Sequence, residues 1–249
     1  YTYRFLANDL GVAKMEEAFS REIGLLGEEG IQRLLASRVA VFGLGGVGSF
    51  AAEALGRAGV GHITLVDGDV VSVSNLNRQL CALHSTIGQS KVEVVKNRLL
   101  DIAPDMDVDA RMFFFDEQHD DGIDFSCYDY IVDAIDSVPS KIALICKAKA
   151  CNVPIISAMG AGNKLDPTKF CVADLSKTSY DPLARILRRE LKKHAIYHLS
   201  VVYSTEEPIA SHTTDGEKRV PSSVSFVPSV MGLIMAGEVI KKIATPMTM

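Results

Sequence analysis

Residues 43–48 read Gly-Leu-Gly-Gly-Val-Gly, a glycine-rich turn of the kind that can hold a phosphate group. Glycine permits a sharp turn and leaves no Cβ in the way, so backbone N–H groups and the N-terminus of the next helix can face the anion. Asp67 follows the next apolar segment, where a carboxylate can accept hydrogen bonds from ribose hydroxyls. The turn and the acid together indicate a bound nucleotide, and by themselves they fit NAD as well as ATP.

Charged residues beyond Asp67 separate these two nucleotides. Arg78 stands in the segment 74–79 (Ser-Asn-Leu-Asn-Arg-Gln), and Lys91 lies at the start of a helical stretch. A cation at the N-terminus of a helix is unfavourable unless a negative group lies near it. Asp136 closes the segment 133–136 (Asp-Ala-Ile-Asp) after another apolar run. Two cations can hold a triphosphate while a carboxylate holds Mg²⁺, so this set favours a phosphoanhydride over hydride transfer.

The elements that position these residues alternate between strand and helix patterns. Short apolar runs bounded by turn residues predict buried strands, at residues 39–42, 62–66, 108–114, 130–132 and 154–157. Helical spacing or composition predicts helices between them, at residues 49–58, 90–102 and 140–151. We therefore expect an α/β fold: a doubly wound, mostly parallel, Rossmann-like sheet with helices on both faces and a C-terminal extension.

The pattern changes beyond residue 160. We expect residues 15–160 to form an ATP-binding Rossmann-like core, and residues 161–249 to form a C-terminal α/β extension that completes the same domain and contacts the substrate. Asp181 as N-cap and Pro182 as the first helical residue predict a helix over 181–194. The remaining expectations are strands at 170–173 and 201–203, a mobile loop at 208–221 and a final helix at 230–243.

Composition limits the class of protein. The 249 residues are 47% hydrophobic and 23% charged, as in an ordinary globular enzyme. The net charge of −5 gives no overall attraction to nucleic acid, so a polyanion would need a local basic patch. No apolar run is long enough to span a membrane and no secretory pattern is visible, so we expect a cytoplasmic protein without membrane contact. Residues 1–14 show no recognisable pattern, and Met15 is a candidate natural start.

The nucleotide motifs closely resemble those of the ubiquitin-activating-like adenylating enzymes, which include the activators of the molybdopterin and thiamin sulfur carriers. The resemblance covers about residues 19–243 and rests on the segments 43–48, 67–69, 75–79, 88–91 and 133–136. It implies a homodimer that binds ATP and Mg²⁺, with Arg78, Lys91, Asp136 and Arg21 as catalytic residues and Asp136 as the Mg²⁺ ligand. Arg21 would reach ATP across the dimer interface. The implied ATP-binding residues are Gly43, Gly45, Gly46, Gly48, Asp67, Asp69, Ser74, Asn75, Arg78, Lys91, Asp136 and Ser137.

The second half resembles a branch of this family that acts on tRNA, the threonylcarbamoyladenosine dehydratases. The segments that carry this likeness are 160–162, 166–168, 174–178, 181–183 and 204–206. It implies ATP-dependent adenylylation of the threonylcarbamoyl carboxylate, then intramolecular cyclisation to the cyclic form, with loss of water overall. The chain has five cysteines and no CxxC pair, so we expect no zinc. A sulfur-relay protein is a possible partner, although serines at 222–223 stand where some members have a cysteine.

The helix at 181–194 carries a cluster of basic residues. An apolar stripe of Leu183, Ile186, Leu187 and Leu191 would face the core, and Glu190 is the one acid among the cations. In an acidic chain this cluster is the best candidate for contact with tRNA phosphates, although a solvated basic face is the ordinary interpretation. The candidate tRNA contacts are Arg185, Arg188, Arg189, Lys192 and Lys193.

Three other functions stay open at this point. The nearest alternative is an adenylyltransferase that activates the C-terminal glycine of a ubiquitin-like sulfur carrier. An NAD-dependent oxidoreductase would account for the glycine turn and Asp67, and would leave Arg78, Lys91 and Asp136 unexplained. A non-catalytic protein that has kept the fold would have no reason to retain the full set of nucleotide residues.

Overall fold

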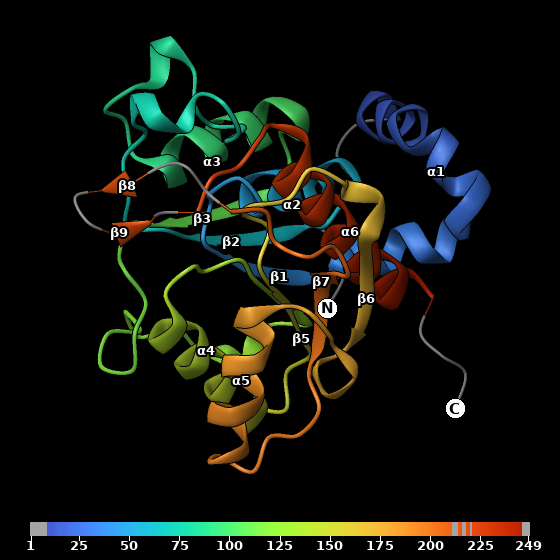
Figure 1. The fold of residues 1–249 in the computed structure, drawn as a ribbon. Helices are drawn as coiled ribbons and strands as arrows, with labels where there is room; N and C mark the ends of the chain where they lie inside the picture. The colour runs from blue at the N-terminus through green and yellow to red at the C-terminus, as the bar shows by residue number, and fades with distance from the viewer. Residues whose placement is uncertain (1–8, 211–213, 216–217, 220, 246–249) are drawn as a thin grey trace.

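The computed structural model describes residues 9–210, 214–215, 218–219 and 221–245. Its centre is a seven-stranded sheet in the order β3-β2-β1-β4-β5-β7-β6 (Figure 1). The strands are β1 (Arg38–Phe42), β2 (His62–Val66), β3 (Asp107–Arg111), β4 (Tyr130–Asp133), β5 (Ile155–Ala158), β6 (Phe170–Asp174) and β7 (Ser200–Ser204). Neighbouring strands are parallel except β6 and β7, which run antiparallel. The predicted doubly wound, mostly parallel sheet is confirmed.

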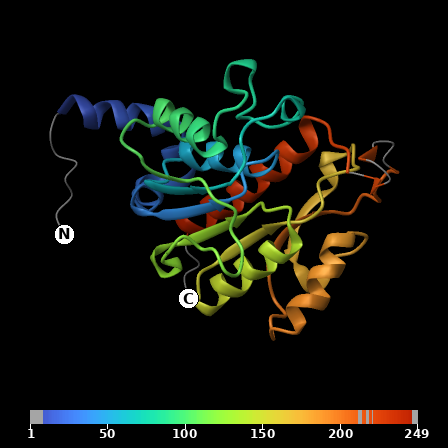
Figure 2. The ribbon, with the colours of Figure 1, turned by 90° about the vertical axis from the view of Figure 1, so that its left-hand side faces the viewer.

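Helices cover both faces of this sheet (Figures 1 and 2). They are α1 (Asp9–Ala36), α2 (Gly48–Arg57), α3 (Lys91–Ile102), α4 (Val138–Ala150), α5 (Pro182–Lys192) and α6 (Phe226–Ala244). Residues of α1, α2, α3 and α6 join one buried apolar cluster, and residues of α4 and α5 join the other. The strand order reverses between β1 and β4, because β2 and β3 lie on one side of β1 and β4 lies on the other. A ligand crevice is expected at this reversal, outside the carboxyl ends of the strands.

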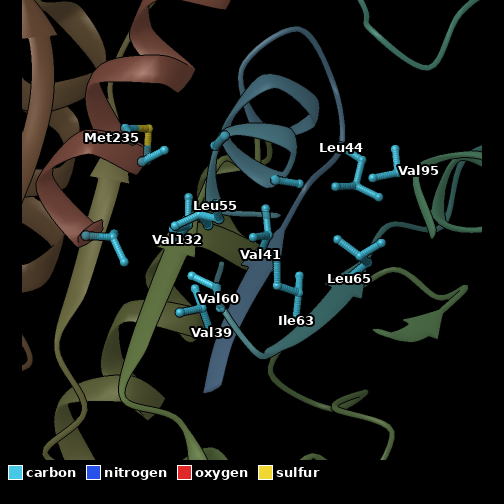
Figure 3. Packing of buried hydrophobic residues seen from close by; sticks show 14 of the residues in the cluster. Val39, Val41, Leu44, Leu55, Val60, Ile63, Leu65, Val95, Val132 and Met235 are labelled. Carbon is cyan, nitrogen blue, oxygen red and sulfur yellow. The ribbon is translucent and has the colours of Figure 1, made fainter. Parts of the chain in front are cut away.

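The alternation of side chains along the central strands explains the two clusters, one of which is drawn in Figure 3 with Val39 and Val41 labelled. Val39 and Val41 of β1 point to the α2 side, while Ala40 and Phe42 point to the α4 side. All four side chains are fully buried, as expected for a parallel strand covered on both faces. Phe42 packs edge-on against Phe115, with ring centroids 5.2 Å apart. The strand that ends in the glycine turn is therefore fixed from both sides.

Most predicted elements match the structure within two residues, and three differ. The strand expected at 108–114 ends at Arg111, because the phenylalanines that follow leave the sheet. The last helix begins at Phe226, four residues earlier than expected. The expected mobile loop at 208–221 contains two short strands, β8 (Thr214–Asp215) and β9 (Lys218–Arg219). Residues 211–213, 216–217 and 220 of that loop lie outside the described residues.

Helix α1 was not predicted. It extends from Asp9 to Ala36 with a non-helical residue at Gly27 (φ 72°, ψ 161°), and residues 1–8 lie outside the described part. Glycines at 24, 27 and 30 lower the helix propensity of this segment. Packing against α6 compensates, and the Arg33 Nε donates a 3.0 Å hydrogen bond to the carbonyl of Ala244 at the end of α6. Tertiary contacts thus hold a helix that local sequence disfavours.

The C-terminal segment continues the same sheet. β7 pairs with β5, and β6 completes the edge, while α6 returns across the sheet to pack on α2. The division of the chain at residue 160 stays a prediction. Among the described residues, no helix combines the length and apolar character needed to cross a membrane.

Candidate nucleotide site

A cavity of about 410 Å³ opens at the carboxyl ends of β1, β2 and β4. This is the place where the strand order reverses. Ten of the residues expected from the sequence line it: Gly43, Gly45, Gly46, Asp67, Asp69, Asn75, Arg78, Lys91, Asp136 and Ser137. Gly48, Ser74 and Arg21 do not line it. The fold thus brings residues that are up to about ninety positions apart in the sequence to the wall of one cavity.

The glycine turn is shaped by close backbone approach. Gly43 has a positive φ of 85°, and a Cβ there would lie 2.6 Å from the carbonyl oxygen of Ala134. A Cβ on Gly48 would lie 1.7 Å from the carbonyl oxygen of Gly43, so Gly48 serves the turn itself. A Cβ on Gly45 would meet only the Gln79 amide, at 3.8 Å. Gly45 therefore keeps space open on the cavity side, as a phosphate-binding turn requires.

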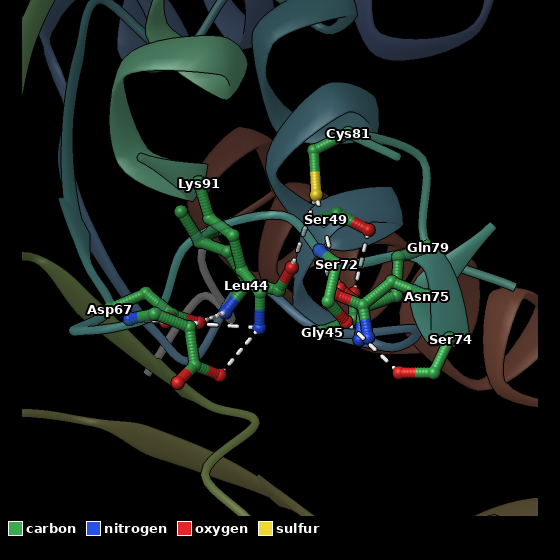
Figure 4. Close-up of polar contacts among 11 residues, drawn as sticks. Leu44, Gly45, Ser49, Asp67, Ser72, Ser74, Asn75, Gln79, Cys81 and Lys91 are labelled. Carbon is green, nitrogen blue, oxygen red and sulfur yellow. Dashed lines mark hydrogen bonds and ion pairs between the residues drawn. The ribbon is translucent and has the colours of Figure 1, made fainter. Parts of the chain in front are cut away.

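Asp67 lies at the end of β2 against this turn (Figure 4). Its Oδ2 accepts a 2.6 Å hydrogen bond from the Leu44 N–H, and its Oδ1 accepts one of 2.8 Å from the Asp69 N–H. Burial raises the pKa of Asp67, while Lys91 and the two backbone donors oppose that rise. The carboxylate is oriented by main-chain donors, and its remaining lone pairs can accept hydrogen bonds from ribose hydroxyls.

Lys91 is the first residue of α3, and its side chain is only 5% exposed. Its Nζ lies 2.6 Å from Asp69 Oδ2 and 4.0 Å from Asp67 Oδ1. These two carboxylates supply the negative charge that a buried lysine at a helix N-terminus needs. The ammonium group is therefore held at the cavity wall without a ligand, and it can form an ion pair with a phosphate there.

Arg78 is held by its own segment. Its Nη1 donates 2.8 Å hydrogen bonds to the Ser74 carbonyl and to Asn77 Oδ1. Asn75 closes the same turn, because its Oδ1 accepts a 3.1 Å hydrogen bond from the Ser72 N–H. Ser74, which the resemblance placed among the ATP-binding residues, contributes a main-chain oxygen that anchors Arg78.

The two aspartates at the end of β4 have different surroundings. Asp133 is fully buried, accepts a 2.8 Å hydrogen bond from Lys141 Nζ and also accepts one from the Ser157 hydroxyl. Asp136 is exposed at the cavity and makes no hydrogen bond or ion pair with another described residue. Asp133 is therefore a structural carboxylate, and Asp136 is available to a cation.

The donor set suits Mg²⁺ held jointly by the protein and a nucleotide. No group of three or more metal-ligating side chains occurs within the described residues. Mg²⁺ commonly takes one or two protein carboxylates and completes its shell with phosphate oxygens and water. Asp136, beside the cations that would hold the phosphates, fits that arrangement.

Three consecutive phenylalanines were missed as site residues. Phe113, Phe114 and Phe115 line the cavity beside Asp67, and Phe114 is 68% exposed. A Cβ on Gly68 would lie 2.7 Å from the Phe114 ring, so the glycine lets this ring approach the chain. The sequence pattern was interpreted as a continuing strand, although a run of aromatic residues beyond the carboxyl end of a strand is a signal for a ligand-facing wall.

Arg21 lies far from the cavity within the same chain. Phe19, two residues before it on α1, lines a second cavity of about 540 Å³ with Gly59 and His62. His62 begins β2, so this second cavity lies at the amino ends of the strands, opposite the nucleotide cavity. Arg21 is exposed and does not line the nucleotide cavity of its own chain, so its contact with ATP across a dimer interface stays a prediction.

The basic residues of α5 and its C-cap Lys193 fall into three groups. Arg188 Nη1 donates to the carbonyls of Leu175 and Thr178, at 3.3 and 3.0 Å, and to the Thr178 hydroxyl. Arg189 and Lys193 form ion pairs with Glu190, at 2.8 and 2.5 Å. Arg185 and Lys192 are exposed and pair with no other described residue. The structure also bears out the predicted cap of this helix, because Asp181 Oδ1 accepts a 2.9 Å hydrogen bond from the Ala184 N–H.

A family model, related sequences and a solved structure all match this chain over most of its length. The model of the ThiF family matches residues 19–248. The tRNA threonylcarbamoyladenosine dehydratase of Bacillus subtilis is 46% identical over 240 residues, which cover 91% of this chain and 94% of that protein. The corresponding Escherichia coli protein is 36% identical over 249 residues, with 91% and 93% covered. A crystal structure of the Escherichia coli dehydratase in complex with ATP superimposes with a TM-score of 0.82 at 34% identity, with 95% and 96% covered.

Proposed function

The chain belongs to the ThiF family, and we propose that it is an ATP-dependent tRNA threonylcarbamoyladenosine dehydratase that yields the cyclic nucleoside. The observation that carries this proposal is the convergence of Arg78, Lys91 and Asp136 on one nucleotide cavity in a chain 46% identical to such an enzyme. An NAD-dependent oxidoreductase would leave those three residues without a role.

The first step is attack by the threonylcarbamoyl carboxylate on the α-phosphate of ATP, which releases pyrophosphate and forms an acyl-adenylate. Arg78 and Lys91 hold the phosphates and neutralise their charge, and Asp67 binds the ribose. Mg²⁺, when held by Asp136, supplies further charge neutralisation at the phosphate oxygens. Gly45 leaves the space through which the phosphates approach the backbone of the turn.

The second step needs no nucleophile from the protein. The neighbouring carbamoyl group closes on the activated carbonyl and expels AMP, so the sum of both steps removes one water. A tethered attacking atom has a high effective concentration, and catalysis then rests on orientation and charge. This agrees with the cysteines, since Cys81 is buried with its pKa raised by burial and none of the five lines the nucleotide cavity.

We assign the tRNA contact to two of the basic residues of α5, Arg185 and Lys192. Their exposed, unpaired side chains can exchange water and counterions for RNA phosphates. Arg188 is fastened to the turn before the helix, so its guanidinium orients α5 and has fewer donors left for RNA. Arg189 and Lys193 would first have to leave Glu190.

A homodimer follows from the position of Arg21 if this residue serves the nucleotide. Mixing Arg21→Ala and Lys91→Ala subunits tests whether Arg21 acts across the dimer interface, because a mixed dimer would then regain one intact site. Recovery of activity in the mixture beyond that of either variant supports contribution across the interface. No recovery, with mixed dimers present by native mass measurement, removes Arg21 from the site.

The nearest alternative is activation of a ubiquitin-like sulfur carrier at its C-terminal glycine. The two functions share the adenylylation step, so the acceptor separates them. We expect ATP–pyrophosphate exchange to depend on tRNA that carries threonylcarbamoyladenosine and to be absent with purified carrier proteins. Exchange with a carrier and none with the modified tRNA would replace the dehydratase assignment. The five unpaired cysteines agree with a reducing compartment, and we place the reaction in the cytoplasm.

A further inference from the structure

The arginine of the nucleotide cavity is connected to the C-terminal half of the chain through one amide side chain. Asn77 Oδ1 accepts a 2.8 Å hydrogen bond from Arg78 Nη1, and Asn77 Nδ2 donates a 3.0 Å hydrogen bond to the carbonyl of Ser223. The guanidinium can only donate and the carbonyl can only accept, so the orientation of the amide follows from its partners. An asparagine is the residue that satisfies both at this reach.

The segment that carries the Ser223 carbonyl is bound to the loop that follows β5 through its neighbour Ser222. The Ser222 N–H donates a 2.8 Å hydrogen bond to Asn163 Oδ1, and the Asn163 N–H donates one of 2.7 Å to the Ser222 carbonyl. The Asn163 carbonyl also accepts a 2.8 Å hydrogen bond from the Ile209 N–H. Asn163 has a φ of 60°, a left-handed conformation that asparagine tolerates better than most residues.

The same loop is anchored to the start of α5. Asp181, the N-cap of that helix, accepts a 3.1 Å hydrogen bond from the Gly160 N–H and lies 3.5 Å from Lys164 Nζ. Both charged side chains are buried, and Lys164 also donates a 2.5 Å hydrogen bond to the Gly160 carbonyl. A Cβ on Gly162 would lie 2.9 Å from Pro221, so the loop and the segment before α6 are in close contact.

We infer that Asn77 is a positioning residue for adenylylation, which sets the orientation of the Arg78 guanidinium by fixing it to the segment before α6. This inference rests on the proposed function, in which Arg78 holds the phosphates. Without Asn77, Arg78 keeps its bond to the Ser74 carbonyl alone and can rotate about it. A displacement of about 1 Å at a charged contact of this type lowers a rate by about a hundredfold.

The test is a cycle of Asn77→Ala, Arg78→Ala and the double variant, with ATP–pyrophosphate exchange on modified tRNA as the assay. We expect Asn77→Ala to lower kcat/KM for ATP by about tenfold to a hundredfold in the native background. In the Arg78→Ala background it should change kcat/KM by less than about twofold, because the group that it positions is gone. Asn97→Ala is the matched control, since Asn97 is an exposed asparagine of α3 whose side chain makes no hydrogen bond to another described residue.

Two outcomes overturn the inference. One is an equal loss in both backgrounds, which is the result for a residue that only supports the fold. The other is a native-like kcat/KM in Asn77→Ala. If the native protein shows no exchange with any acceptor, the proposed function fails, and the same cycle is run on ATP affinity by calorimetry. There we expect Asn77→Ala to weaken ATP binding about threefold or more only while Arg78 is present, and equal weakening in both backgrounds rejects the positioning role.

Discussion

Exchanging Asp133, the last residue of β4, or Asp136, three residues after it, for asparagine should distinguish a carboxylate that stabilises the fold from one that takes part in the reaction. Asp133→Asn leaves Lys141 charged in a site where both side chains are fully buried. At the 2.8 Å separation of Lys141 Nζ and Asp133 Oδ2, the Coulomb attraction is about 6 kcal/mol for an effective dielectric constant of about 20. Removing one partner of a buried pair typically costs about 3–5 kcal/mol of unfolding free energy.

That cost predicts a clear thermal shift. One kcal/mol moves Tm by about 2–4 °C in a protein of this size, so Asp133→Asn should unfold about 6–20 °C below the native protein. Asp136→Asn should change Tm by less than about 2 °C, because an exposed side chain without partners contributes within about 0.5 kcal/mol.

The two variants should rank in the opposite order for activity, with Asp136→Asn more impaired than Asp133→Asn. Loss of the Asp136 carboxylate would remove the proposed protein ligand to Mg²⁺, so the Mg²⁺ concentration for half-maximal exchange should rise and the rate should fall by about a hundredfold or more. Asp133→Asn, assayed well below its own Tm, should keep the native Mg²⁺ dependence. The reasoning is refuted if Asp136→Asn retains native Mg²⁺ dependence, or if Asp133→Asn is as stable as the native protein.

Four further variants test other parts of the protein. Lys91→Met should weaken ATP binding by about a hundredfold or more, since it removes a buried positive charge at the phosphates, and calorimetry that finds native affinity would contradict this role. Burial raises the pKa of Asp67, so its ionisation costs stability as pH rises from the ordinary value of 3.8 through the raised one. Asp67→Asn should therefore gain in Tm relative to the native protein as pH increases through that interval, and a constant difference would count against it. Replacing Arg185 and Lys192 by glutamine should weaken tRNA binding and lower its salt slope by about 2, while Arg188→Gln should mainly lower Tm. Equal salt slopes in filter-binding titrations would show that Arg185 and Lys192 contact no phosphates.

Most of the predicted site residues line one cavity because the sequence signals that identify them are local. An apolar run that ends in a glycine or an aspartate marks the carboxyl end of a buried parallel strand, and such ends meet at one edge of a sheet. Gly43, Asp67 and Asp136 each follow such a run, and all three line the cavity. The order of the parallel strands then brings these three residues together, and no contact between distant side chains has to be known to predict it.

The missed features depend on contacts between distant segments. Asp133 and Asp136 are alike in the sequence. Only the contacts with the Lys141 and Ser157 side chains show that the Asp133 carboxylate already has hydrogen-bond partners within the protein. Helix α1 forms against α6 despite its glycines, with Arg33 bonded to the end of α6. Arg188 belongs to a run of cations, and its bonds to the turn before α5 exist only once that turn has folded.

Mass analysis of nucleosides tests the central claim most directly. Native protein, ATP, Mg²⁺ and tRNA that carries threonylcarbamoyladenosine are incubated together, and the tRNA is then digested and compared with a sample without ATP. The proposed function predicts that threonylcarbamoyladenosine is converted to a product lighter by the mass of one water, with AMP and pyrophosphate released in equal amounts. Unchanged nucleoside, in a protein that binds ATP and the modified tRNA, would contradict it.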